Sequence, residues 1–159
     1  MTAVVEFQRF DLQQLPELMT WFPDARTLRV WGGPDFRFPF TAASFREDAK
    51  VDTIDSFSLG DGELAAFGQC YLRVERCHFG SVAVAPSRRG EGLGSRLFHE
   101  MADWGRARFG PRELSLFVNR DNPEVHRLYL RLGFREVPYP DPEFMPEAHY
   151  MIADRMRER

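Results

Sequence analysis

The sequence predicts one α/β domain over residues 1–159, and three observations support that fold class. A chain of 159 residues favours a single domain. Short β-branched runs alternate along the chain with amphipathic helical patterns. No repeat, linker or low-complexity tract divides the chain. Apolar residues make up 43% and charged residues 28% of it, as in ordinary globular proteins.

The first elements are a strand and a helix, followed by an aromatic segment. Val4–Phe10 alternates weakly between apolar and polar residues, which predicts a strand. Asp11 can cap a helix that follows. The apolar positions of this helix are Leu12, Leu15, Leu18 and Met19. Trp21–Phe40 has no clear period and is expected to be irregular, whereas Thr41–Lys50 is expected to be helical.

A β-hairpin is predicted in the middle of the chain. Its strands are Thr53–Leu59 and Leu64–Val74, and they flank the turn signal Gly60-Asp61-Gly62. Cys77–Ala85 is the next strand. A helix is expected over Gly92–Phe109 because apolar residues recur on one face. These residues are Leu93, Leu97, Met101 and Trp104.

The last third of the chain predicts strands around one more helix. Leu114–Val118 is a strand candidate. Asn122-Pro123-Glu124 combines a capping residue, proline at the first helical position and an acid near the positive end of the helix, and Gly133 is the expected C-cap. A short strand after Phe134 and a final strand over His149–Ala153 complete the expected sheet.

Charge and composition exclude several classes of function. A net charge of −3 gives no reason to expect nucleic acid or a membrane as partner. The N-terminus lacks the apolar core of a signal peptide, so the expected location is cytoplasmic. Cys70 and Cys77 are expected to be buried thiols in a reducing cytosol. His99 and His149 have no partners at metal-ligand spacing, so no metal is expected.

A glycine-rich loop follows the strand residues Val82, Ala83 and Val84. The loop and helix start comprise Arg89, Gly90, Glu91, Gly92, Leu93, Gly94 and Ser95. Glycines leave backbone N–H groups open, and a helix N-terminus attracts anions, so a phosphate site is one interpretation. The spacing G-x-G-x-G departs from the dinucleotide fingerprint, and the lysine of the P-loop is missing. A tight strand-to-helix turn is the other interpretation.

Two motifs in order resemble the GNAT superfamily of acetyl-CoA-dependent N-acetyltransferases. The first is VAVAP followed by [RQ]-x-x-G-x-[GA], here Arg89–Gly94. The second is LSLFVNRDN with Asn122, Tyr129 and Gly133-Phe134; Val125 stands where the family usually has alanine. The resemblance implies a GNAT fold: a central mixed, mostly antiparallel sheet of six to seven strands, flanked by about four helices and splayed between the fourth and fifth strands.

The resemblance also implies acetyl-CoA as co-substrate. Its pantetheine arm is expected to pair with the backbone of Val82–Val84. Arg89–Ser95 is expected to hold the pyrophosphate. Asn122 is either a contact to the cofactor arm or an N-cap alone.

The implied reaction is attack of an amine on the thioester through a tetrahedral intermediate, with a backbone N–H near Val84 stabilising the oxyanion. Tyr129 is the candidate acid, and its alternative role is in the core. His78 is the candidate base, because it stands where some family members place a glutamate. Its alternative role is structural, with the proton passing to water. Glu75 is a weaker candidate base.

The acceptor is expected to be a primary amine of a small molecule. Aromatic residues in Trp21–Phe40 and Val137–Tyr150, with acids in the second segment, favour a cationic amine. In the alternative interpretation the rings pack a core and the acids are solvated. A protein N-terminus or lysine is the alternative acceptor, and a non-catalytic acyl-CoA-binding module the alternative function. A homodimer is left open.

Overall fold

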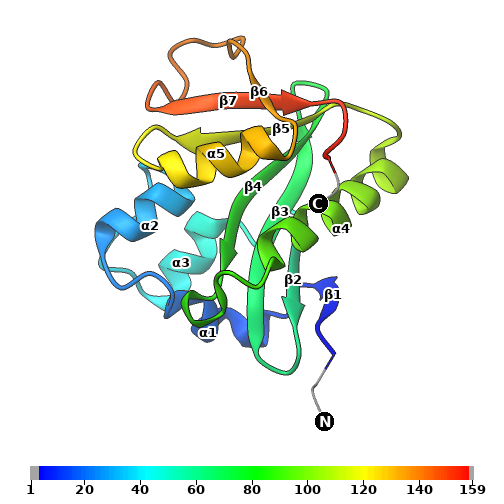
Figure 1. Cartoon of the computed structure of the whole chain (residues 1–159). Helices are drawn as coiled ribbons and strands as arrows, with labels where there is room; N and C mark the ends of the chain where they lie inside the picture. Colours follow the sequence, from blue (N-terminus) through cyan, green and yellow to red (C-terminus); the bar gives the residue numbers. More distant parts are fainter. Residues whose placement is uncertain (1–3, 158–159) are drawn as a thin grey trace.

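Seven strands form one sheet in the computed structural model, which describes residues 4–157 (Figure 1). The strands are β1 (Glu6–Arg9), β2 (Ser56–Gly60), β3 (Leu64–Arg73), β4 (Arg76–Val84), β5 (Leu114–Asn119), β6 (Arg135–Glu136) and β7 (Ala148–Ala153). Their order is β1-β2-β3-β4-β5-β7-β6, and only β4 and β5 pair in parallel. The mixed, mostly antiparallel sheet is therefore confirmed. Residues 1–3 and 158–159 of the expected domain lie outside the described residues.

Local capping signals fix most of the helices. The α-helices are α1 (Leu15–Met19), α2 (Ala25–Gly32), α3 (Ala42–Ala49), α4 (Leu93–Phe109) and α5 (Pro123–Arg131), with 3₁₀ turns η1 (Leu12–Gln14) and η2 (Pro86–Arg88). Asp11 caps η1, and Thr41 forms a reciprocal capping box with Ser44 at the start of α3. Asn122 caps α5, and Gly133 follows its end with a φ of 103°.

The expectation of an irregular Trp21–Phe40 segment is wrong, because this segment contains α2. Asp24 accepts a hydrogen bond from the Thr27 N–H at 2.7 Å, which is a normal N-cap. Leu28 is fully buried, and Gly33 ends the helix with a φ of 106°. With α2 included, the described chain has five α-helices, where about four were expected.

The sheet separates two hydrophobic cores. Leu97, Phe98 and Met101 of α4 pack on one face, together with Tyr129 of α5. The other face is covered by α1, α2 and α3, whose core includes Phe45. Figure 1 shows α4 and α5 on the side of the sheet nearer the viewer. Strand β3 is buried on both faces, which is why most of its residues are apolar.

The fourth and fifth strands separate partway along their length. β4 pairs with β5 only from Cys77 to Phe79, so the splay expected between these strands is confirmed. β4 also contains an extra residue relative to β3: Phe67 pairs with Ala83 and Gln69 with Gly80. Ser81 within this bulge has a φ of 52°. The remaining edge, Gly80–Val84, thus has no strand partner on its β5 side among the described residues.

Over residues 4–157, the structure contains no helix that is both long and apolar enough to cross a membrane.

Candidate active site

A pocket of about 460 Å³ lies where β4 ends and α4 begins. It is lined by Val84, Arg88, Arg89, Gly90, Glu91, Gly92, Leu93, Gly94, Ser95 and Leu128. Leu128 comes from α5, so this helix forms one wall of the pocket. The structure therefore brings the whole expected loop and Val84 to a single cavity, with Val82 and Ala83 half-buried on the strand just before it.

The loop backbone adopts a conformation that favours glycine. Gly90 and Gly92 have φ values of 86° and 78°, in the left-handed region. Gly92 is the N-cap of α4 and supplies no side-chain hydrogen bond to the first turn. The first N–H groups of α4 thus have no side-chain cap, at the positive end of the helix dipole. This arrangement suits a phosphate group.

Two adjacent arginines have different surroundings. Arg88 donates to Asp61 on the β2–β3 turn at 2.8 Å and to Glu91 at 3.3 Å, which ties the loop to the hairpin. The hydrogen bond from Arg88 lowers the pKa of Asp61. Arg89 is exposed and forms no ion pair or hydrogen bond with residues 4–157. Its guanidinium group is therefore free to contact an anion in the pocket.

Ser95 provides a further polar group at this pocket. Its Oγ is buried and has no hydrogen-bond partner in the described part of the chain. Buried hydroxyl groups are usually paired, so this one can serve a ligand once its side chain turns toward the pocket that Ser95 lines. The residues present thus fit a pyrophosphate: open N–H groups, a free arginine and an unpaired hydroxyl.

Trp31 holds the bulge at the free edge of β4. Its indole Nε1–H donates to the Ser81 carbonyl oxygen at 2.7 Å. The indole also stacks on Phe22, with ring centroids 4.2 Å apart. The free edge beyond Ser81 can accept an extended ligand that carries amide groups, as a sheet edge accepts a peptide.

Tyr129 follows Leu128 on α5, but it is not among the residues that line the pocket. Its ring is 8% exposed and packs edge-to-face on Phe98, with ring centroids 5.4 Å apart. Burial raises the pKa of the phenol, so the hydroxyl stays protonated. It forms no hydrogen bond with other residues in the range 4–157. At the start of α5, Asn122 Oδ1 accepts a 3.4 Å hydrogen bond from the Val125 N–H and so caps the helix.

His78 lies in the paired part of β4 and is 2% exposed. Its Nδ1 shares a 2.8 Å hydrogen bond with Ser115 Oγ, and its ring packs between Tyr71 and Phe117. Burial lowers the pKa of the imidazole to about 3. The neighbouring Phe79 packs against α4, and strand side chains alternate, so His78 faces the opposite side of the sheet. The structure does not bring His78 and Tyr129 together.

The aromatic residues expected on the acceptor side have two distinct environments. Trp21, Phe22 and Phe36 are buried in the core under α1, α2 and α3. For these three rings the interpretation in which they pack a core is confirmed, and they do not line an acceptor wall.

The second aromatic segment surrounds an arginine of the protein itself. The Arg73 guanidinium carbon lies 4.5 Å from the Phe144 ring centroid, 5.4 Å from Phe117 and 5.6 Å from Tyr139. Asp141, Glu143 and Glu147 on the same loop are exposed. The rings are thus already engaged with a cation, whereas the carboxylates are open to solvent.

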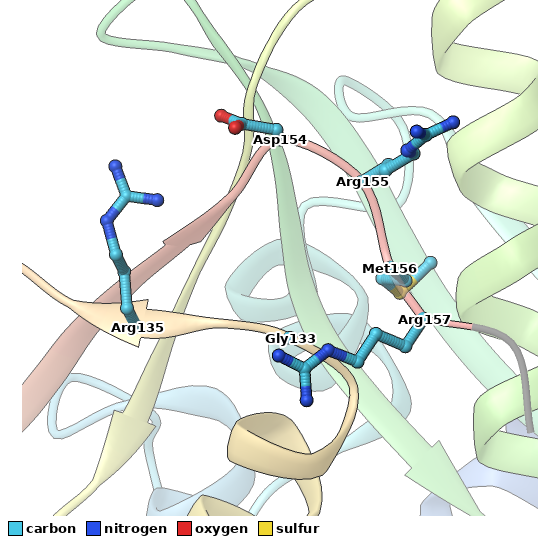
Figure 2. A pocket seen from close by; sticks show the side chains of 6 residues that line it. All are labelled: Gly133, Arg135, Asp154, Arg155, Met156 and Arg157. Carbon is cyan, nitrogen blue, oxygen red and sulfur yellow. The ribbon is translucent and has the colours of Figure 1, made fainter.

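A second cavity, of about 510 Å³, lies at the other end of the sheet. It is lined by Gly133, Arg135, Asp154, Arg155, Met156 and Arg157. Figure 2 shows the three guanidinium groups pointing in different directions, and Asp154 adds a carboxylate among them. Because these polar groups do not converge, this cavity is the weaker candidate.

Two histidines, His126 and His149, lie together with Glu136 in the fold, which the sequence analysis did not predict. His149, expected to lack metal-ligand partners, lies beside His126 and Glu136. The spacing argument was wrong here, because the three residues come from α5, β6 and β7 and meet only in the folded chain.

Sequence reasoning missed several residues that shape the site. Trp31 and Ser81 are joined across 50 positions, and Leu128 lines the pocket from another helix. The Asp24 cap and Gly32-Gly33 pair were available signals for α2, and hence for the position of Trp31. No sequence signal marks the Ser81 bulge.

Comparisons with known proteins agree with the fold. Streptothricin acetyltransferase of Streptomyces lavendulae is 34% identical over 104 residues, which are 61% of this chain and 54% of that protein. The chain thus spans about half the length of this curated relative.

Solved structures show the same fold. PaiA N-acetyltransferase from Thermoplasma acidophilum in complex with coenzyme A has a TM-score of 0.68 at 15% identity, over 94% of this chain and 98% of that one. The ribosomal-protein-S18-alanine N-acetyltransferase of Escherichia coli has a TM-score of 0.64 at 21% identity, over 94% and 93%. Residues 16–134 match the model of the Acetyltransferase (GNAT) family, and the chain belongs to that family.

Proposed function

We propose that the protein is an acetyl-CoA-dependent N-acetyltransferase acting on a primary amine of a small molecule. The observation that carries this proposal is the pocket where the glycine loop, the N-terminus of α4 and the free edge of β4 meet. Membership of the GNAT family supports the reaction class. The coenzyme A complex of a protein with the same fold supports the co-substrate.

The proposed cofactor position follows from the polar groups available. Backbone N–H groups of Gly90–Ser95, the free guanidinium of Arg89 and the unpaired Ser95 hydroxyl would hold the pyrophosphate. The pantetheine amides would pair with the free edge Val82–Val84. Asn122 keeps its capping role and stands at the start of the helix that forms the opposite wall.

Acyl transfer forms a C–N bond and breaks the C–S bond of the thioester. Backbone N–H groups on the free edge near Val84 would stabilise the oxyanion. Tyr129 is the proposed donor to the departing sulfur, because its raised pKa keeps the hydroxyl protonated. A thiol titrates near 8.5, so complete transfer from this phenol is uphill, and the main contribution would be a hydrogen bond to the sulfur as it gains charge.

His78 fits a structural role better than the role of base. A neutral, buried imidazole with a pKa of about 3 has little affinity for a proton. Its hydrogen bond to Ser115 joins β4 to β5 just before the strands separate. We therefore favour the alternative in which the amine attacks in its neutral form and the proton that its nitrogen then carries passes to water, with His78 positioning the two strands.

The acceptor class rests on the relative and on local charge. The similarity to streptothricin acetyltransferase favours a small molecule. Asp141, Glu143 and Glu147 favour a cationic amine, since each ammonium–carboxylate pair is worth about 1 kcal/mol in water at 4 Å. The aromatic rings add little, because Arg73 already occupies the space between them.

A binding measurement followed by a transfer assay tests the proposal. Calorimetry with acetyl-CoA should show one site, and no heat at millimolar cofactor would overturn the proposal. Release of free coenzyme A should then be followed with mono- and diamines, neutral amines and peptides with free N-termini. Preference for peptides would support the protein acceptor, and binding without transfer would support a non-catalytic module.

A further inference from the structure

His126, Glu136 and His149 meet at one point on the surface of the sheet. They come from α5, β6 and β7, which lie together at one end of the molecule (Figure 1). Each residue offers one ligand atom, and these atoms all lie within 4.8 Å of one another. None of the three lines the candidate acetyl-CoA pocket.

We propose that these three side chains bind a divalent transition-metal ion such as Zn²⁺. Two imidazole nitrogens and one carboxylate oxygen are a donor set that zinc takes in proteins, with a fourth position left to solvent. Harder ions such as Mg²⁺ and Ca²⁺ prefer oxygen donors alone, so the two histidines favour a transition metal. This proposal does not depend on the proposed acetyltransferase function.

The present arrangement brings the three donor atoms near one another without directing them at one point. The two imidazole rings are parallel, with centroids 4.2 Å apart and planes 8° apart. His149 Nδ1 lies 2.9 Å from Glu136 Oε2. Ligand atoms at tetrahedral zinc lie about 3.3 Å apart, given bonds of roughly 2.0–2.1 Å. Because the two ring planes are nearly parallel, their in-plane nitrogen lone pairs do not converge, so one imidazole must turn out of the stack before all three ligands reach one ion. The half-exposed Glu136 leaves the point open to solvent.

One positive charge opposes a metal at this place. Arg120 Nη2 lies 3.9 Å from Glu136 Oε1, the carboxylate oxygen that does not contact His149. Repulsion between the guanidinium and a divalent ion weakens binding, whereas removal of the charge should strengthen it. If the two histidines only pack on each other, removal of the Arg120 charge has no reason to strengthen metal binding, so this variant distinguishes a metal site from simple packing.

A bound ion would also connect three elements of the fold. α5 carries Leu128, which lines the candidate acetyl-CoA pocket, and the ion would tie this helix to β6 and β7. Binding to the folded chain alone raises its thermal stability by mass action. A rise in melting temperature with ZnCl₂ is therefore an expected, activity-independent signal.

Calorimetric titration of the untagged protein with ZnCl₂ is the first test. We expect one ion per chain, and a loss of affinity of at least about tenfold in His126→Ala, His149→Ala and Glu136→Gln. His99→Ala, a partly exposed histidine on α4, is the matched control and should bind as the wild type does. Arg120→Gln should bind more tightly. Circular dichroism without metal checks that each variant is folded.

The absorption spectrum of the Co²⁺-loaded protein is the second test. We expect the visible bands of a four-coordinate ion with nitrogen and oxygen ligands. A thiolate charge-transfer band would place the ion at Cys70 and Cys77, whose Sγ atoms are 3.2 Å apart, and would overturn the proposal. Absence of binding, or equal affinity in the wild type, His126→Ala, His149→Ala and Arg120→Gln, would also overturn it.

Discussion

The indole N–H of Trp31 donates a hydrogen bond to the backbone carbonyl of Ser81, with 2.7 Å between nitrogen and oxygen. This bond joins α2 to the bulge of β4, where the strand leaves its regular register with β3. The φ of 52° at Ser81 is uncommon for a residue with a side chain, so the bulge depends on surrounding contacts. The edge proposed to hold the cofactor and the oxyanion begins at this point.

Trp31→Phe should lower both stability and turnover. The ring can still stack on Phe22, but the Ser81 carbonyl loses its donor, which costs about 1–3 kcal/mol of unfolding free energy. A shifted bulge should reduce kcat in the folded fraction as well. Urea denaturation and steady-state kinetics measure the two effects.

Trp21→Phe is the matched control for this prediction. Trp21 is buried in the same core and has no hydrogen bond to Ser81. Equal loss of kcat per folded molecule in both variants would mean that the Trp31 bond has no specific effect on the site.

A negative charge placed at Gly94 should weaken binding of acetyl-CoA. A Cβ at Gly94 would lie 3.5 Å from Val84 Cγ2, an ordinary contact, so a side chain is accommodated. Gly94→Glu is also favourable for the first turn of α4, but its carboxylate would repel phosphate. We expect at least about tenfold weaker binding by calorimetry, equivalent to 1.4 kcal/mol.

Gly94→Gln has nearly the same shape without the charge, so it separates repulsion from steric blocking. It should bind acetyl-CoA more tightly than Gly94→Glu does. If Gly94→Glu binds as well as the wild type, the phosphate groups lie elsewhere. If both variants lose binding equally, the side chain blocks the pocket by its size.

Much of the fold could be predicted because its signals are local. Asp11, Thr41 and Asn122 each cap a helix at the expected place, and Gly60-Asp61-Gly62 turns the expected hairpin. Helix α2 was not predicted because it is only eight residues long and Leu28 is its one buried residue, so the apolar residues around it show no clear helical spacing.

The parts of the site that could not be predicted depend on long-range contacts. Arg88 and Arg89 are adjacent and chemically identical, and the positions of Asp61 and Glu91 in the fold decide which of them is engaged. The register shift at Ser81 is a property of strand pairing and has no local signal. His126 and His149 meet only because β7 lies beside β5 and α5 packs nearby.

Tyr129→Phe should lower kcat with little effect on stability. The hydroxyl has no hydrogen-bond partner within residues 4–157, and the ring contacts with Phe98 remain in the variant. Acid catalysis by a positioned side chain contributes typically about 10²–10⁴-fold, so a loss near the lower bound is expected. The affinity for acetyl-CoA should change much less.

Tyr150→Phe serves as the control for Tyr129→Phe, since it removes a buried hydroxyl that is bonded to Arg76 on another part of the sheet. Its kcat should stay close to that of the wild type. Unchanged kcat in Tyr129→Phe, or a similar loss in both variants, would assign Tyr129 to the core.

The last prediction concerns the buried imidazole of His78 and the stability of the protein at acid pH. Its pKa is about 3 in the folded chain and about 6.5 in an unfolded chain. Between these two pH values the unfolded chain binds more protons than the folded chain does. Burial of the neutral His78 imidazole therefore contributes to the free energy of unfolding fully above pH 6.5, and this contribution is lost as the pH falls towards 3. The slope from this one group is at most about 1.4 kcal/mol per pH unit.

His78→Asn should flatten this slope between about pH 6.5 and 4.5, a range that lies above the lowered pKa values of Asp48 and Asp61. Asparagine keeps a polar atom near Ser115, and His99→Asn is the control with a partly exposed histidine. Urea denaturation at several pH values measures the slope. The acid limb of kcat/KM should be unchanged in folded His78→Asn, because a base with a pKa of about 3 does not titrate there. A shifted or missing limb would instead restore His78 as the catalytic base, and an unchanged stability slope would show that its imidazole becomes protonated without unfolding the chain.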